Sequence, residues 1–157
     1  MLSLTSAAFG SRGEIPEPYT CDGENASPPL SWLEVPENAE SLAIVLDDPD
    51  APSGTFTHWI LYNIPPVRTR LPGGFSPGLE EGEGMREGRN DFNHIRYEGP
   101  CPPVGDNAHH YHFRLYALDT MPNLPPGATR DQFYDTIEGH VLEESELVGT
   151  YRREAGI

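Results

Sequence analysis

The stretch from Asp47 to Asn63 reads D-D-P-D-A-P-S-G-T-F-T-H-W-I-L-Y-N and carries the signal for the central strands of the fold. The apolar runs Leu42–Leu46 and Trp59–Tyr62 flank a loop rich in proline, glycine and aspartate. Short apolar runs on either side of such a loop are typical of two buried strands joined by an irregular connection. The sequence therefore predicts a pair of core strands with a stiff, acidic loop between them.

Asp48 is the residue of this stretch that calls for an explanation. Successive side chains alternate across a strand, so Asp48 shares a face with the two apolar residues at positions 44 and 46. A half-buried carboxylate costs several kcal/mol, to order of magnitude, unless it is paired or hydrogen-bonded. Pro49 and Pro52 fix φ and stiffen the loop, so Asp48, Asp50 and His58 can be held in set positions. Two interpretations stay open: a proline-rich hairpin with exposed acids, or a polar site.

The length and composition predict one mainly β domain spanning residues 1–157. A chain of 157 residues is long enough for a single sizeable core and short for two. Its 16 glycines and 17 prolines favour short strands and many loops over helices. No apolar run reaches the length of a membrane helix, and the first residues do not resemble a secretory signal. A cytoplasmic protein is expected.

The net charge of -15 comes from 25 acidic residues against 10 basic residues, all of them arginine. Such a surface repels phosphate backbones and anionic headgroups at long range, which argues against nucleic-acid binding and against unassisted docking on an acidic membrane. No membrane insertion is expected. Abundant carboxylates without lysine also suit a cytoplasm of very high salt, where screening acts over about 3 Å at 1 M. A halophilic source is the resulting hypothesis. It fails if the fold and melting temperature are unchanged on dialysis from molar salt to about 0.05 M.

The two cysteines, Cys21 and Cys101, match no zinc-binding spacing. In a cytoplasm, two reduced thiols are the favoured interpretation. Both lie in loops rich in proline, glycine and aspartate, and a disulfide stays open as the alternative.

The segment His109–Leu118 has the aromatic and apolar content of a long strand. Alternation places His109 and Tyr111 on one face, in line with apolar residues at 113 and 115, and His110 and His112 on the other. The first face runs from polar to apolar, as expected of a strand whose end lines a pocket and whose remainder lines a core. We expect His110 and His112 to pack on the surface or the sheet.

The remaining elements are predicted from local signals. Thr129 and Gln132 form a capping box, which predicts a helix start. Near-helical spacing extends that helix through an apolar stripe at Phe133, Ile137, Val141 and Leu142, with His140 buried on it. Short strands are expected at Asn90–Tyr97 and Val148–Tyr151.

Histidine, tyrosine and aspartate side chains can meet if the strand His109–Leu118 lies near the loop that joins the two core strands. Two imidazoles, a phenol and the amides of the Cys101 loop would then supply hydrogen-bond donors around a small cavity. Donors in that arrangement bind oxyanions such as phosphate, sulfate or a carboxylate. A carboxylate facing an imidazole favours its charged form, which makes His58 or His109 a better partner for an anion.

Several motifs along the chain carry a family resemblance. They are S-P-P-L-S-W (Ser27–Trp32), D-P-D-A-P (Asp48–Pro52), H-W-x-x-x-N-I-P (His58–Pro65), Y-x-G-P-C-P-P-x-G (Tyr97–Gly105), H-H-Y-x-F (His109–Phe113), G-H-V-L (Gly139–Leu142) and G-T-Y-R-R (Gly149–Arg153). In this order they resemble the phosphatidylethanolamine-binding protein family, in its prokaryotic branch similar to the Raf kinase inhibitor proteins. The similarity extends over nearly the whole chain.

The resemblance implies a fold and a set of site residues. The fold is mainly β, with a large central antiparallel sheet, a second smaller sheet and one or two helices near the C-terminus. The pocket residues that it implies are Asp48, His58, Cys101 through its backbone, His109 and Tyr111, with Asp50, Pro52, Pro102 and Pro103 shaping the rim. Eukaryotic members have glycine at the position of Cys101 and arginine at that of His110, so their lipid preference and kinase inhibition are not carried over.

Three classes of function follow from these observations. The first is a non-enzymatic binding protein for a small phosphate-like anion, which also regulates a partner protein such as a kinase or protease. The second is an acid–base or metal-dependent hydrolase that uses the Asp and His groups, against which stands the lack of an H-E-x-x-H or G-x-S-x-G motif. The third is an inhibitor that acts by surface recognition alone. No cofactor, metal or catalytic residue is assigned, and a homodimer is left open.

Overall fold

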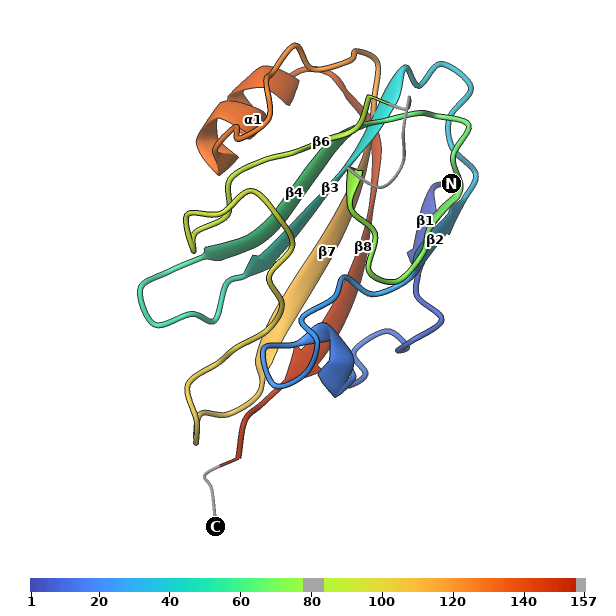
Figure 1. Cartoon of the computed structure of the whole chain (residues 1–157). Coiled ribbons are helices and arrows are strands. Elements are labelled where there is room, and N and C mark those ends of the chain that lie inside the picture. The colour runs from blue at the N-terminus through green and yellow to red at the C-terminus, as the bar shows by residue number, and fades with distance from the viewer. Residues whose placement is uncertain (78–83, 155–157) are drawn as a thin grey trace.

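An antiparallel sheet of five strands runs through the centre of the molecule (Figure 1). The structure is a computed structural model that describes residues 1–77 and 84–154. The strands of this large sheet, in spatial order, are β6 (Arg86–Glu87), β4 (Phe56–Ile64), β3 (Ser41–Asp48), β7 (His109–Leu118) and β8 (Val141–Tyr151). A smaller antiparallel sheet contains β1 (Ser3–Thr5), β2 (Leu30–Leu33) and β5 (Arg70–Leu71). These two sheets confirm the predicted fold class.

The large sheet is covered on both faces. One face packs against the small sheet through a core that includes Leu4, Trp32, Ile44 and Trp59. The opposite face packs against helix α1 (Arg130–Ile137) through a second core that includes Val45, Ile60 and Phe133. Because both faces are covered, every residue of β3 is buried, and its sequence reads as a continuous apolar run rather than an alternating one.

Helix α1 begins where the sequence predicts. Thr129 caps it by accepting a hydrogen bond from the Gln132 amide, and the Gln132 side chain accepts one from the Thr129 amide. The predicted extension of the helix was wrong. The chain turns at Gly139, where φ is 81°, and the residues from Val141 onward pair with β7 as strand β8. His140 lies in that turn, half exposed with its ring bonded to Asp119, and is not buried on the helix.

The strand predicted at Asn90–Tyr97 was also wrong. The Asn90 side chain organises this segment as a turn, since its Oδ1 accepts hydrogen bonds from the amides of Phe92 and His94. Its Nδ2 donates to the carbonyl of Arg96 at 2.9 Å. Asparagine often replaces backbone partners in this way, so the local turn is satisfied without a neighbouring strand.

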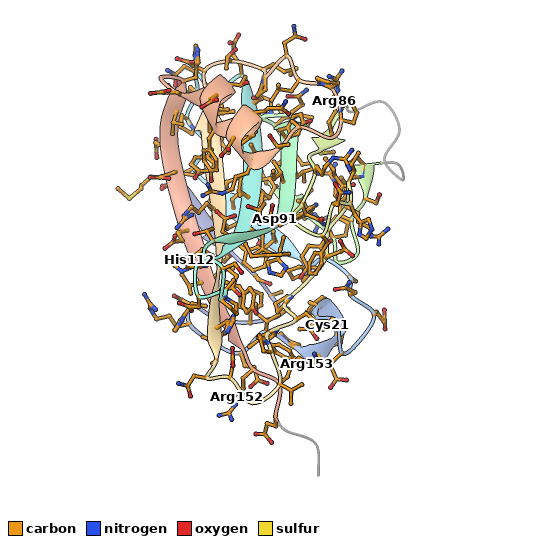
Figure 2. All side chains as sticks on the ribbon, turned by 90° about the vertical axis from the view of Figure 1, so that its left-hand side faces the viewer. Cys21, Arg86, Asp91, His112, Arg152 and Arg153 are labelled. Carbon is orange, nitrogen blue, oxygen red and sulfur yellow. A yellow bond between two sulfur atoms is a disulfide. The ribbon has the colours of Figure 1, made fainter. Side chains whose placement is uncertain are left out.

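Cys21 and Cys101 form a disulfide, so the favoured interpretation of two reduced thiols was wrong. The bond joins the loop after the 3-10 helix η1 (Glu17–Tyr19) to the loop after Tyr97, and Cys21 lies beside Arg153 at this end of the molecule (Figure 2). Neutral hydrogen bonds join the same two loops. The amide of Cys21 donates to the carbonyl of Pro100, and the hydroxyl of Tyr97 donates to the carbonyl of Tyr19.

In the described part of the chain, no helix has the length and apolar content needed to span a membrane.

Candidate functional site

The loop ends of β3, β4 and β7 meet at one end of the large sheet, opposite the end that carries α1 (Figure 1). A cavity of about 210 Å³ lies there. It is lined by Asp48, Ala51, Pro52, Phe56, His58, Phe92, Cys101, Pro102, Pro103, His109 and Tyr111. The structure therefore brings together eight of the nine residues that the resemblance implies for the pocket. Asp50 does not line it.

Asp48 and His109 form a buried pair at the base of this cavity. The Nδ1 of His109 donates to Asp48 Oδ2 at 2.7 Å, and the exposed fractions of the two side chains are 6% and 4%. The second ring nitrogen, Nε2, lies 3.2 Å from a carboxylate oxygen of Asp106. Carboxylates only accept, so an imidazole that bonds two of them carries both protons. Burial opposes this charge, but the bonds to Asp48 and Asp106 outweigh burial and raise the pKa of His109.

His58 reaches the cavity because β4 has a bulge. The strand pairs on either side of the bulge are Leu46 with Trp59 and Asp47 with Thr57. His58 is thus an extra residue in β4, and regular alternation would otherwise place it on the helix face together with Ile60. Its ring instead lies edge-on to Tyr111 on the pocket face, with the ring centroids 5.5 Å apart. Bulges often redirect a side chain in this way next to functional sites.

His58 is held in one tautomer by the backbone. Its Nδ1 lies 2.8 Å from the carbonyl oxygen of Glu98, and since a carbonyl only accepts, this nitrogen carries a hydrogen. Burial lowers the pKa of His58, and the opposing effects of the Glu98 carbonyl and the Asp48 charge do not cancel that of burial. In the neutral ring Nε2 is therefore an acceptor, and on protonation it becomes a second donor.

Tyr111 presents an unpaired hydroxyl at this cavity. The residue is fully buried, and its hydroxyl oxygen has no hydrogen-bond partner among the described residues. Burial and the nearby Asp48 carboxylate raise the pKa of Tyr111, so the hydroxyl keeps its proton and remains a donor. A buried polar atom without a partner is rare in folded proteins and costs about 1–3 kcal/mol. A ligand that accepts from this hydroxyl would remove the cost.

The two pocket histidines are expected to titrate on opposite sides of 6.5, their ordinary pKa. Histidine-detected NMR over a pH series measures this directly, and equal midpoints would contradict the assignment. The signs for folding follow from linkage. His58 contributes stability that is present above pH 6.5 and is lost as the pH falls through its lowered value. His109 contributes stability that is present below pH 6.5 and is lost as the pH rises through its raised value.

An aromatic wall on one side of the cavity was missed by sequence reasoning. The Phe56 and Phe92 rings pack edge to face, with centroids 4.7 Å apart, and both contact His58. Phe92 was missed because its segment was predicted as a strand. Asp106, the second carboxylate partner of His109, was also missed. Its position three residues before His109, the first residue of β7, is a signal from which it could have been predicted.

The remaining predicted residues lie around the cavity in different roles. Asp50 accepts from the amide and ring of His110 at the surface. His112 bonds Glu146 on the outer side of the sheet, and the surface placement expected for His110 and His112 is confirmed. Cys101 lines the cavity while its sulfur is in the disulfide.

A larger groove of about 680 Å³ follows the small sheet. Its charged lining side chains are Arg68 and Arg70, neither of which is buried, whereas the smaller cavity contains buried titratable groups on three strands. In residues 1–77 and 84–154, no cluster of three or more His, Cys, Asp or Glu side chains is arranged to hold a metal ion.

A family model described as phosphatidylethanolamine-binding protein matches residues 5–152. The chain belongs to the phosphatidylethanolamine-binding protein family. Within the family it is similar to a UPF0098 protein from Methanothermobacter thermautotrophicus, with 51% identity over 97% of this chain and 99% of the relative. A UPF0098 protein from Pyrococcus abyssi is 52% identical over 94% of this chain and 84% of the relative. The resemblance inferred from the motifs is confirmed.

Solved structures of the phosphatidylethanolamine-binding protein family have the same fold. The crystal structure of the homologue CT736 from Chlamydia trachomatis superposes with a TM-score of 0.88, at 38% identity over 97% of both chains. The crystal structure of YbcL from Escherichia coli, described as a member of the mammalian family, superposes with a TM-score of 0.89 at 31% identity, over 96% of this chain and 98% of YbcL.

Proposed function

We propose that this chain is a non-enzymatic binding protein whose cavity takes phosphate or a small phosphorylated headgroup. Family membership supports a binding protein in general. The single observation that carries the proposal is the buried Tyr111 hydroxyl, which has no hydrogen-bond partner in residues 1–77 and 84–154, at a cavity shared with Asp48, His58 and His109. A donor held in a buried position without a partner is preorganised for an acceptor, and a phosphate oxygen is a strong one.

The charge at the cavity decides which groups bind the anion. Both nitrogens of His109 already bond carboxylates, and the ring charge is used to balance Asp48 and Asp106. The side-chain donors that remain are the Tyr111 hydroxyl and, once the His58 ring is protonated, its Nε2. The family resemblance adds the backbone amide of Cys101. Proton uptake by His58 therefore accompanies capture of a fully ionised anion. For sulfate, which stays fully ionised over this range, binding should tighten as the pH falls below 6.5, because the lowered pKa leaves His58 uncharged in the free protein. Phosphate monoesters take up a proton of their own at about pH 6, so their affinity should change less.

The volume and the rim favour a small headgroup that also carries an amine. A cavity of about 210 Å³ is smaller than the sites that hold drug-sized ligands. Asp106 and Asp50 lie at or beside the rim with half-exposed carboxylates, which would attract a cationic group on the ligand. Phosphorylethanolamine, the headgroup in the name of the family, combines the two charges.

The Tyr111→Phe variant is expected to bind inorganic phosphate about tenfold or more weakly than the wild type, because it loses a hydrogen bond to a charged oxygen. Its stability should be unchanged or higher, since the deleted hydroxyl makes no hydrogen bond to the described residues. Calorimetric titration and chemical denaturation measure the two effects. The matched control is Tyr116→Phe on the same strand, whose hydroxyl bonds Tyr134 on the opposite face. This control should lose stability and keep the affinity.

Parallel titrations with phosphorylethanolamine and ethanolamine identify the part of the headgroup that binds. Tighter binding of phosphorylethanolamine than of phosphate supports a contribution from the acidic rim. Binding of ethanolamine without any binding of phosphate would overturn the proposed anion pocket. Equal affinity of the wild type and Tyr111→Phe for phosphate would remove the role given to Tyr111.

The hydrolase alternative would use the same Asp48–His109 pair, but the cysteine at the cavity supplies no nucleophile for it. Cys101 is bonded to Cys21 and therefore presents no free thiol. Esterase and phosphatase screens test this alternative. Four further expectations stay predictions. A pull-down tests regulation of a partner protein, and light scattering tests a homodimer. Thiol trapping in cells tests a cytoplasmic location, and salt-dependent melting tests a high-salt source.

A further inference from the structure

We infer that Thr57, hydrogen-bonded to Asp47 and Asp91, positions the side chains that line the cavity. Thr57 does not line the cavity itself and would act through its neighbours. This inference rests on the proposed function, because the positioned groups are the ones given to the ligand.

Thr57 is fully buried and uses its side chain and both backbone groups on two partners. Its hydroxyl donates to Asp47 Oδ1 at 2.9 Å, which links strands β4 and β3 across their facing pair. Its amide donates to Asp91 Oδ2 at 2.7 Å, and its carbonyl accepts from the Asp91 amide at 2.9 Å. Asp91 lies beside the start of β4 (Figure 2). One threonine thus joins three separate segments of the chain.

Each member of the Asp47–Thr57–Asp91 network is next in sequence to a residue that lines the cavity. Asp47 precedes Asp48, and Asp91 precedes Phe92. Thr57 stands between Phe56 and His58, which also line it. A shift in any one of these three segments would move a lining residue, and the network fixes all three to each other.

Asp47 gives the network a fixed point in the body of the fold. Its side chain is 1% exposed, and Oδ2 accepts from Arg114 on β7 at 3.4 Å and from Arg130 at the start of α1 at 3.2 Å. A buried carboxylate without these two arginine partners would strongly destabilise the fold. The position of Asp47 is therefore set by β7 and α1 together. Through Asp47, Thr57 is tied to the helix side of the large sheet.

Because of the bulge, the orientation of His58 depends on the hydrogen bond between Thr57 and Asp47. A strand can lose a bulge by sliding one residue, which would turn the following side chains to the other face. The hydrogen bond from the Thr57 hydroxyl to Asp47 favours pairing of these two residues, and this pairing makes His58 the bulged residue of β4. With Thr57 in place, His58 faces Tyr111 and its Nδ1 reaches the Glu98 carbonyl.

The test compares Thr57→Val, Thr57→Ser and Ile60→Val with the wild type. Valine keeps the shape of threonine and removes the hydroxyl, whereas serine keeps the hydroxyl. Ile60→Val is the matched control, because Ile60 is a buried residue of the same strand on the helix side that belongs to the second core rather than to the network. Inorganic phosphate is the probe, and histidine NMR of the free protein is the second readout.

Thr57→Val is expected to weaken phosphate binding about threefold to tenfold and to shift the His58 resonances and their titration midpoint. Thr57→Ser should restore both, and Ile60→Val should leave both unchanged despite a loss of stability. A Thr57→Val variant that binds phosphate within about twofold of the wild type, with unchanged His58 resonances, would overturn the inference. Absence of phosphate binding by the wild type would overturn the proposed function instead, and the His58 resonances of the free variants would still decide whether Thr57 positions the ring.

Discussion

Replacing both cysteines by serine, Cys21→Ser with Cys101→Ser, is expected to lower the free energy of unfolding by about 4 kcal/mol. The disulfide closes a loop across a sequence separation of 80 residues, and the chain-entropy stabilisation grows with the length of the closed loop. The folded state should survive, since the two loops are also joined by backbone and side-chain hydrogen bonds. One of these runs from the amide of Gly99 to Asn25 Oδ1 at 2.7 Å, and another from the amide of Cys21 to the carbonyl of Pro100 at 3.1 Å.

Urea denaturation of the wild type with and without a reductant measures the same effect without a mutation. The double serine variant is the control, because a reductant should leave its midpoint unchanged. A change below about 1 kcal/mol in the wild type would mean that the unfolded chain is not constrained by this bond. Because Cys101 lines the cavity, phosphate affinity should also fall in the variant.

Asp48→Asn is expected to destabilise the protein by about 3 kcal/mol, since removing one partner of a buried ion pair leaves the other charge uncompensated. The affected partner is His109, whose remaining ion-pair partner among the described residues is the half-exposed Asp106. The pKa of His109 should fall, because Asp48 is one of the two groups that raise it. The stabilisation that His109 gives below pH 6.5 would then be lost at a lower pH than in the wild type.

Asp50→Asn is the matched control for Asp48→Asn. Asp50 also pairs with a histidine, His110, but the exposed fractions of the two side chains are 43% and 45%. Exposed pairs contribute about 0–1 kcal/mol, so this variant should lose less than about 1 kcal/mol. Chemical denaturation of both variants at pH 6 and pH 8 gives the comparison. Equal losses for Asp48→Asn and Asp50→Asn would contradict the buried pair at the base of the cavity.

Strand alternation predicted the parts of the site that lie on regular strands. His109 and Tyr111 face the cavity and His110 and His112 face outward, as alternation along β7 requires. The same alternation from Leu42 placed Asp48 in line with a core face, where a partner was needed, and that partner is His109. The capping box at Thr129 likewise predicted where α1 begins, because its two hydrogen bonds involve neighbouring residues alone.

Features that depend on distant segments were not predictable from the local pattern. The bulge that turns His58 to the cavity is defined by pairing with β3, and nothing in the sequence around His58 marks it. Val141 continued the helical spacing, yet pairing with β7 made it the start of β8. Phe92 reached the cavity because the Asn90 side chain closed a turn where a short strand was expected. In each case tertiary contacts outweighed local preference.

Anion binding in the cavity can be seen in a crystal of the protein soaked in inorganic phosphate. We expect phosphate in the cavity between β3, β4 and β7, with one oxygen at hydrogen-bond distance from the Tyr111 hydroxyl and another near His58 Nε2. Phosphate bound only at surface arginines, with an ordered water on the Tyr111 hydroxyl at a saturating phosphate concentration, would contradict it.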